Sequence, residues 1–264
     1  MLESAVHPLD MINLNADLGE SFGAWSMGDD PAMLDVVASA NIACGFHAGD
    51  PLVMRQTVRA ALTRGVSLGA HPSFPDLQGF GRRRMDLPPP ELEAGLVYQI
   101  GALQGVAAAE GGRVTHVKPH GALSNMACAD AALAETVARA VRALDRDLIL
   151  LAPAHSALAR AGERAGLRVA LEVFADRAYQ DDGQLVPRSQ PGAVLHGAEA
   201  CWPHVQRMLE ARALVSVTGR HLPTTIDSVC VHGDGAGAVA IARAIRAGLV
   251  AAGIAVVPLP QLPG

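Results

Sequence analysis

Aromatic residues and lysine are both scarce in this chain. Only 3% of its 264 residues are aromatic although 50% are hydrophobic, so a core has to be built from Ala, Val, Leu and Ile. Of the 21 lysines and arginines, Lys118 is the single lysine. The formal charge is −5, and the one basic run, at 82–84, is too short for a tail and fits a local anion clamp or a solvated loop. Without a basic patch, we expect no nucleic acid among its ligands.

Paired cysteines and long apolar runs are also missing. The four cysteines form no C-x-x-C pair, a spacing that fits neither a zinc knuckle nor a disulfide framework. The apolar stretch 247–260 is short and broken by proline, so we expect no membrane span. Residues 1–10 have no apolar centre of the kind that signal peptides carry. These absences predict a reduced, cytoplasmic protein without membrane attachment.

Apolar runs of strand length alternate with longer segments that show the i, i+3, i+4 spacing of amphipathic helices. This alternation implies βα units and a mostly parallel sheet. No linker or repeat interrupts it. We therefore expect an extension at 1–10 and one domain over 11–264, a distorted (β/α) TIM-like barrel with seven or so strands. The expected strands are 12–17, 40–46, 66–72, 114–120, 148–153, 169–176 and 228–234.

Polar residues gather where six of these strands end. In a parallel barrel all such ends lie on one face, where the loops build the active site. The agreement of six strand ends therefore predicts one shared site. Its candidate residues are Asn15, Asp17, Glu20, His47, His71, Lys118, His120, Glu172, Asp176, Arg177, His232 and Asp234.

Three of these side chains form a candidate metal site. Asp17, His47 and His71 supply a carboxylate and two imidazoles, which suit one divalent ion. The alternative is that they hydrogen-bond to one another or to a substrate without metal. Asp50 has a structural explanation instead, because an aspartate before Pro51 is a typical helix N-cap.

Lys118 stands in the sequence VKPHG at a predicted strand end. An amine buried at a barrel mouth either loses its proton or acts as a compact charge against a developing oxyanion. Arginine does neither in that volume. The alternative is that one lysine persists by chance in an arginine-rich chain.

Two arginines are candidates for binding an anion. Arg177 can hold a substrate carboxylate with its bidentate fork, or form an ion pair with Asp176 that shapes its own loop. Arg188 lies in the irregular segment 181–197, which is long enough to cover a site. A solvated loop is the alternative for Arg188.

The segment VHGDGAGAVAIARAI reads as strand, glycines and helix. Its Gly233, Gly235 and Ala238 match the G-x-G-x-x-G/A pattern, yet it opens the last βα unit and no acidic residue follows at the required distance. We reject a dinucleotide site and expect a backbone anion site, with His232 and Asp234 facing the same cavity. Since no Walker A motif occurs, the chain alone is not expected to be an ATPase.

Taken together, NLNADLGE, NIACGFHAGDP, GAHPSFPD, GFGRR, VKPHGAL, EVFADRAY, LVPR and VHGDGAGAV resemble the motif series of the LamB/YcsF family. The resemblance covers about residues 11–260, in the same order. One departure is Ser124, where the family usually has tyrosine.

The resemblance implies a distorted barrel similar to the glycoside hydrolase/deacetylase superfamily. It also implies opening of 5-oxoproline (pyroglutamate) to L-glutamate, with ATP hydrolysed to ADP and phosphate by an enzyme that includes partner subunits B and C. A divalent metal is possible. We expect the catalytic residues to be Asp17, His47, His71, Lys118, His120 and Asp234. We expect the substrate-binding residues to be Asn15, Glu172, Arg177, His232, Gly233 and Gly235.

Two alternatives remain at this point. One is a metal-dependent deacetylase of carbohydrates or other amides that uses Asp17, His47 and His71. The other is a non-catalytic subunit that holds 5-oxoproline while a partner does the chemistry. Metal content separates the first from the main hypothesis, and the activity of site variants in the assembled enzyme separates the second.

Overall fold

The first strand, β1 (Met11–Leu18), shows how side chains are sorted between two environments. In this computed structural model, which describes residues 10–233 and 237–263, its side chains are buried on both faces. Ile12 and Leu14 belong to the apolar core, whereas Asn13 and Asn15 hydrogen-bond to residues of other strands. Successive side chains of a strand point to opposite faces. The polar face of β1 therefore lines the inside of the barrel, and its apolar face packs against the helices.

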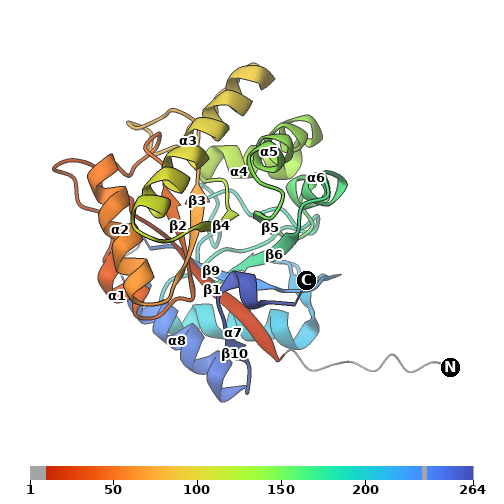
Figure 1. Cartoon of the computed structure of the whole chain (residues 1–264). Helices are drawn as coiled ribbons and strands as arrows, with labels where there is room; N and C mark the ends of the chain where they lie inside the picture. Colours follow the sequence, from red (N-terminus) through yellow and green to blue (C-terminus); the bar gives the residue numbers. More distant parts are fainter. Residues whose placement is uncertain (1–9, 234–236, 264) are drawn as a thin grey trace.

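Seven parallel strands close into a barrel, which confirms the predicted fold class (Figure 1). Their order is β1-β2-β3-β4-β5-β6-β9, and the pairing of β1 with β9 completes the circle. A closed sheet leaves no edge strand exposed to further pairing. The remaining six strands of the barrel are β2 (Ser39–Ala43), β3 (Ser67–His71), β4 (Val114–Val117), β5 (Ile149–Pro153), β6 (Val169–Phe174) and β9 (Ser228–Val231).

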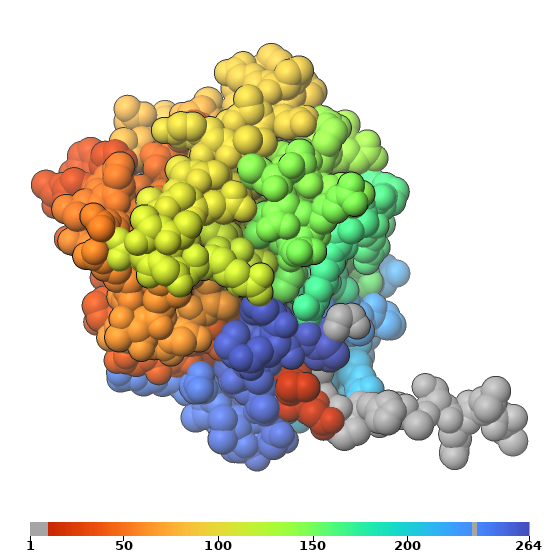
Figure 2. All heavy atoms as spheres, viewed as in Figure 1, coloured from red at the N-terminus to blue at the C-terminus, as the bar shows by residue number. Residues whose placement is uncertain are grey.

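Helices surround the barrel, and the space-filling view shows α3 (yellow) beside α5 (green) as one continuous surface (Figure 2). Helix α2 starts as predicted: Pro51 is its first residue, and the Asp50 carboxylate accepts hydrogen bonds from the amides of Leu52 and Val53. The helices are α1 (Asp30–Leu34), α2 (Pro51–Thr63), α3 (Pro89–Ala109), α4 (Gly121–Ala129), α5 (Ala131–Leu144), α6 (Ala157–Arg164), α7 (Ala198–Ala211) and α8 (Ala238–Ala251).

The C-terminal segment closes the end of the barrel where the strands begin. Strand β10 (Ala255–Val256) pairs with the start of β1, and a 3₁₀ turn, η1 (Leu259–Gln261), follows it. The Asn13 amide donates to the carbonyl of Val257 (2.8 Å), and the amide of Leu259 donates to Ser39 Oγ (3.1 Å). With this end covered, the opposite end of the barrel is left for a site.

Several elements differ from the predicted ones. The strands predicted at 40–46, 114–120 and 228–234 end earlier, at Ala43, Val117 and Val231, so the polar residues beyond them lie on loops. Pro119 has no amide to donate to a neighbouring strand, which accounts for the early end of β4. The antiparallel hairpin of β7 (Ala213–Val215) and β8 (His221–Pro223) was not predicted. Helices α1 and α4 were not predicted either.

All four cysteines are buried and free. Among the residues that the structure describes, none of the helices has the length and apolar character that crossing a bilayer requires. The predicted extension at 1–10 lies almost wholly outside the described residues.

Gly69 on β3 provides a test of barrel packing. A Cβ there would overlap the imidazole of His116, which fills the barrel interior beside it. We expect Gly69→Ala to lower the free energy of unfolding by about 1–3 kcal/mol, the usual cost of overpacking a core. Chemical denaturation measures this. Gly101→Ala is the matched control, because a Cβ at this position of α3 meets nothing within 4 Å. An unchanged Gly69→Ala protein would contradict the packing described here.

Candidate active site

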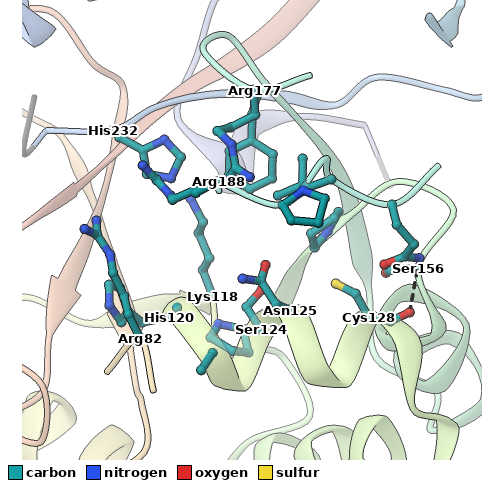
Figure 3. A pocket seen from close by; sticks show the side chains of 18 of the residues that line it. Arg82, Lys118, His120, Ser124, Asn125, Cys128, Ser156, Arg177, Arg188 and His232 are labelled. Atoms are coloured by element: carbon teal, nitrogen blue, oxygen red, sulfur yellow. Dashed lines mark hydrogen bonds between the residues drawn. The ribbon is translucent and has the colours of Figure 1, made fainter. Parts of the chain in front are cut away.

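A cavity of about 450 Å³ opens where the barrel strands end (Figure 3). Its floor is the end of the barrel where the strands end, and its walls are the segments after β3, β4, β5, β6 and β9. The irregular segment 181–197 covers part of it, as predicted, through 183–188. The charged and imidazole side chains that line it are Asp17, His71, Arg82, Arg84, Lys118, His120, Arg177, Arg188 and His232.

Lys118 lies at the centre of the floor, with 4% of its surface exposed. Its ammonium is 3.0 Å from Asp17 Oδ1 and 3.0 Å from Glu172 Oε2. It also lies 2.9 Å from Cys230 Sγ and 3.3 Å from Asn15 Oδ1. An ammonium has three protons on one atom, and these acceptors come from three different strands. The planar fork of an arginine does not fit this arrangement.

The charges of this group decide between the two roles predicted for the lysine. Burial alone lowers the pKa of Lys118, but Asp17, Cys230 and Glu172 outweigh burial and raise the pKa well above its usual value. Burial alone raises the pKa of Asp17, but His71 and Lys118 hold it well below 3.8. Burial keeps the Cys230 thiol protonated by raising its pKa. Lys118 is therefore a permanent compact charge and not a neutral amine.

A polar network inside the barrel supports the lysine from below. Asn15 donates to Glu172 Oε2 (3.0 Å) and Ser228 Oγ (2.8 Å). Asn41 donates to Asn15 Oδ1 (2.7 Å) and Asp17 Oδ1 (2.9 Å). Asn15 and Glu172 were predicted to bind substrate, but in this structure they lie beneath the cavity and fix Lys118.

Four residues meet behind the cavity floor. One ligand atom each of Glu20, His47, His71 and His120 lies within 4.8 Å of the others, and all four residues are buried. The predicted metal set of Asp17, His47 and His71 is thus not the set that comes together. Asp17 approaches His71 Nε2 (3.4 Å) but faces Lys118, while Glu20 contacts His47 Nε2 (3.1 Å). Glu20 and His120 were predicted at the site, but not as ligands.

His232 and Asp176 form an ion pair in the cavity wall. His232 Nδ1 is 2.9 Å from both carboxylate oxygens of Asp176, and its ring stacks on Phe174. Burial alone lowers the pKa of His232, but Asp176 reverses the effect and raises it above 6.5. Burial alone raises the pKa of Asp176, but His232 holds it below 3.8. The pair therefore favours the positively charged form of the His232 imidazole in the cavity wall.

Arg177 hydrogen-bonds to the segment 181–197, part of which lines the cavity. Its guanidinium donates to the carbonyls of Val186 (2.8 Å) and Ala193 (3.3 Å), while Asp176 binds His232 instead. Burial and the neighbouring Arg188 lower the pKa of Arg177 to about 10, so it remains charged. Figure 3 shows Arg82, Arg177 and Arg188 around the cavity together with His232 and Lys118. The positive wall predicted from two arginines thus has further members in Arg82 and Arg84.

The predicted glycine loop is described only in part. Gly233 packs against β1 so closely that a Cβ would lie 2.7 Å from the carbonyl oxygen of Asp17. Asp234 and Gly235, predicted as catalytic and substrate-binding, lie outside the described residues. Their predicted roles therefore stay predictions.

Three interior residues of the site were missed: Asn41, His116 and Cys230. Two of them lie two positions before a predicted site residue: His116 precedes Lys118, and Cys230 precedes His232. The strand period of two was the signal that could have found His116 and Cys230. Arg82 and Arg84 belong to the basic run at 82–84, one interpretation of which is a local anion clamp, and both reach the cavity from a loop. No comparable signal marked Asn41.

Fold and site together define a (β/α)-barrel protein with a lysine–carboxylate centre and a cavity for a small anion. The chain belongs to the LamB/YcsF family, whose model matches residues 12–264. This confirms the predicted family.

Relatives with names are similar in sequence to this chain over nearly its whole length. A protein of Azoarcus sp. (strain BH72), named as the A subunit of 5-oxoprolinase, is 66% identical over 95% of this chain and 98% of its own. A protein of the same name from Nitrobacter hamburgensis is 56% identical over 94% of this chain and 97% of its own. The crystal structure of a lactam utilization protein from Thermus thermophilus superposes with a TM-score of 0.88. It is 44% identical and covers 94% of this chain and 99% of its own.

Removing Lys118 leaves two carboxylates buried beside each other. We expect Lys118→Met to lower the free energy of unfolding by about 3–5 kcal/mol, because an unpaired buried charge is costly. The double variant Lys118→Met/Glu172→Gln should recover part of this loss, since it removes one of the two repelling charges. Denaturation of both variants measures the difference. Equal stabilities of the single and double variants would contradict the described charge centre.

The Asp176–His232 pair makes the stability of the folded chain depend on pH, and the directions of the two pKa shifts fix the sign of this dependence. The raised pKa of His232 adds stability that is present below its usual 6.5 and is lost as pH rises through the folded value. The lowered pKa of Asp176 adds stability that is present above 3.8 and is lost as pH falls through the folded value. A double-mutant cycle with Asp176→Asn and His232→Gln should thus give a larger coupling energy near pH ~5.5 than near pH ~9. Equal coupling at both pH values would refute the pairing.

Proposed function

We propose that this chain is the A subunit of an ATP-dependent 5-oxoprolinase. It opens 5-oxo-L-proline (pyroglutamate) to L-glutamate while ATP is hydrolysed to ADP and phosphate, and it acts with subunits B and C. The observation that carries the proposal is the cavity, where the Lys118–Asp17 centre faces a wall of arginines. The names of the relatives from Azoarcus and Nitrobacter support the same function.

The charges of the cavity suit this substrate. 5-Oxoproline carries one carboxylate and a neutral lactam, and a phosphorylated form carries further negative charge. Arg177 and Arg188 stand at the wall with Arg82 and Arg84, where guanidinium groups can hold carboxylate and phosphate oxygens. Lys118 at the floor supplies a compact charge for an oxygen that becomes negative during the reaction.

The need for ATP follows from the stability of the lactam. A five-membered lactam is a poor electrophile, and phosphorylation of its carbonyl oxygen by ATP activates the carbon. The sequence has no Walker A motif, so we assign ATP binding and the phosphoryl transfer to the partner subunits. ATP is then a cosubstrate of the assembled enzyme. The four free cysteines and the use of ATP support a cytoplasmic location.

The barrel residues would then act on the phosphorylated lactam. Ionised Asp17 aligns a water molecule and accepts a proton from it as the water oxygen forms a bond to the activated carbon. The ring nitrogen takes one proton from the protonated His232 and one from Asp17 as the carbon–nitrogen bond breaks, and the remaining hydroxyl proton returns to His232. The resulting acyl phosphate is cleaved by a second water to glutamate and phosphate. Lys118 would hold the developing oxyanion in place of Cys230, because a thiol sulfur is a weak acceptor.

A metal-dependent amide deacetylase is the second candidate function. The observation that favours it is the cluster of Glu20, His47, His71 and His120, which suits a divalent ion. It differs from the main proposal in needing neither ATP nor partner subunits. A purely binding role is the remaining alternative, and it is tested by variants of cavity residues.

Reconstitution tests the proposed function. The isolated chain should not convert 5-oxoproline, because the activated substrate is missing. Addition of subunits B and C should start ADP release that depends on 5-oxoproline. In this mixture Asp17→Asn should lower kcat/KM by about 100-fold or more, the scale of one lost stabilising group at a reacting centre.

Asp130→Asn is the control for that experiment. Asp130 caps α5, is exposed and does not line the cavity, and asparagine caps a helix equally well, so activity should stay near the wild-type value. Glutamate formation by the isolated chain would show that the activation step is misplaced. Full activity of a folded Asp17→Asn protein would instead leave the chain with a binding role.

A further inference from the structure

The hydrogen bonds of His71 and His120 fix where their ring protons are. His71 Nδ1 lies 2.6 Å from the carbonyl oxygen of Lys118, and His120 Nε2 lies 2.8 Å from the carbonyl oxygen of Phe80. A carbonyl oxygen only accepts, so each of these nitrogens carries a proton. In the neutral rings, His71 Nε2 and His120 Nδ1 are then both unprotonated.

These two unprotonated nitrogens face each other at 2.9 Å. Two lone pairs at this distance repel unless a positive species lies with them. The carboxylate of Glu20 adds negative charge at the same point, 3.5 Å from His120 Nδ1 and 3.1 Å from His47 Nε2. One ligand atom from each of four residues therefore lies within 4.8 Å of the others, and among the residues that the structure describes no hydrogen is placed between the two imidazoles.

A shared proton and a metal ion are the two species that can relieve this repulsion. A proton would make one buried imidazole positive. A metal ion instead accepts both lone pairs, and the Glu20 carboxylate beside His120 Nδ1 offsets its charge. Neutral imidazoles with free lone pairs are the form in which histidine binds metals.

We propose that Glu20, His47, His71 and His120 bind one divalent transition-metal ion of the zinc class. Three imidazoles and one carboxylate are a donor set that suits Zn²⁺ and its neighbours better than Mg²⁺ or Ca²⁺. The carbonyls of Lys118 and Phe80 already orient two of the ligands, as outer hydrogen bonds do in metal sites.

One ring has to move for this coordination. His47 and His120 are stacked, with centroids 3.8 Å apart and an interplanar angle of 6°, so both cannot point their lone pairs at one ion without a tilt. His47 Nδ1 is buried without a hydrogen-bond partner, which leaves the His47 ring the freer of the two. His71 and His120 line the cavity, so an ion can enter from it. This inference holds whether or not the reaction proposed above is correct.

Metal content and thermal stability of the full-length chain test the proposal. The chain is stripped with a chelator, incubated with Zn²⁺, Mn²⁺ or Mg²⁺, dialysed, and measured by elemental analysis and thermal melting. We expect about one zinc per chain and a rise in Tm with Zn²⁺, because an ion that binds only the folded state stabilises it. Mg²⁺ should give neither.

Two ligand variants and one control locate the ion. His71→Gln and His120→Gln should each lose stoichiometric zinc and the Tm rise. His204→Gln should keep both, because this buried histidine lies outside the cluster and hydrogen-bonds to the carbonyl of Arg177. Spectra of the Co²⁺-loaded wild-type chain should show nitrogen and oxygen ligands without a thiolate charge-transfer band.

Three results would overturn the proposal. One is wild-type chain that takes up no stoichiometric zinc and shows no Tm shift, which would leave a shared proton between His71 and His120. Another is zinc that stays bound in both glutamine variants. The third is a thiolate band in the cobalt spectrum, which would place the ion with Cys230, Asp17 and His232, the second group of possible ligands.

Discussion

The ammonium of Lys118 is the group on which the rest of the site depends. It is buried in the mouth of the barrel between Asp17 and Glu172, at 3.0 Å from each. Without the ammonium, the two carboxylates would repel each other. Without the carboxylates, an ammonium buried this far from solvent would lose its proton. The Lys118 ammonium and the Asp17 carboxylate therefore keep each other ionised. A chain that uses arginine at twenty other positions needs an amine here, because one small cation has to meet acceptors from three strands.

This charge centre is possible because the barrel interior is polar. Barrel cores are commonly filled with branched apolar side chains, yet here Asn15, Asn41 and His116 form hydrogen-bonded layers below the lysine. Every polar group in such an interior needs a hydrogen-bond partner. At the end where the strands begin, the C-terminal segment provides partners for Asn13 and Ser39. The interior thus forms a rigid base for the cavity, while the apolar faces of the same strands bind the helices.

The site has two parts that share a border. On the cavity side, Lys118, His232 and the arginines present positive charge to an anionic ligand. Behind it, Glu20, His47, His71 and His120 bring together lone pairs and a carboxylate. Asp17 lies between the two, 3.0 Å from Lys118 and 3.4 Å from His71. A change of charge in either part therefore alters the electrostatic environment of the other part through the carboxylate of Asp17.

The sequence by itself determined the family, the barrel and most of the residues at its mouth, because alternating apolar periods and polar strand ends are local patterns. It also determined that Asp50 caps a helix. Only the tertiary structure decided which residues meet. The closure of β1 on β9 brings Cys230 to Lys118, and the loops after β1, β2 and β4 bring Glu20, rather than Asp17, to His47 and His120. The tertiary structure also decided that Lys118 is charged, because its pKa depends on distances to residues on strands that are far apart in the chain.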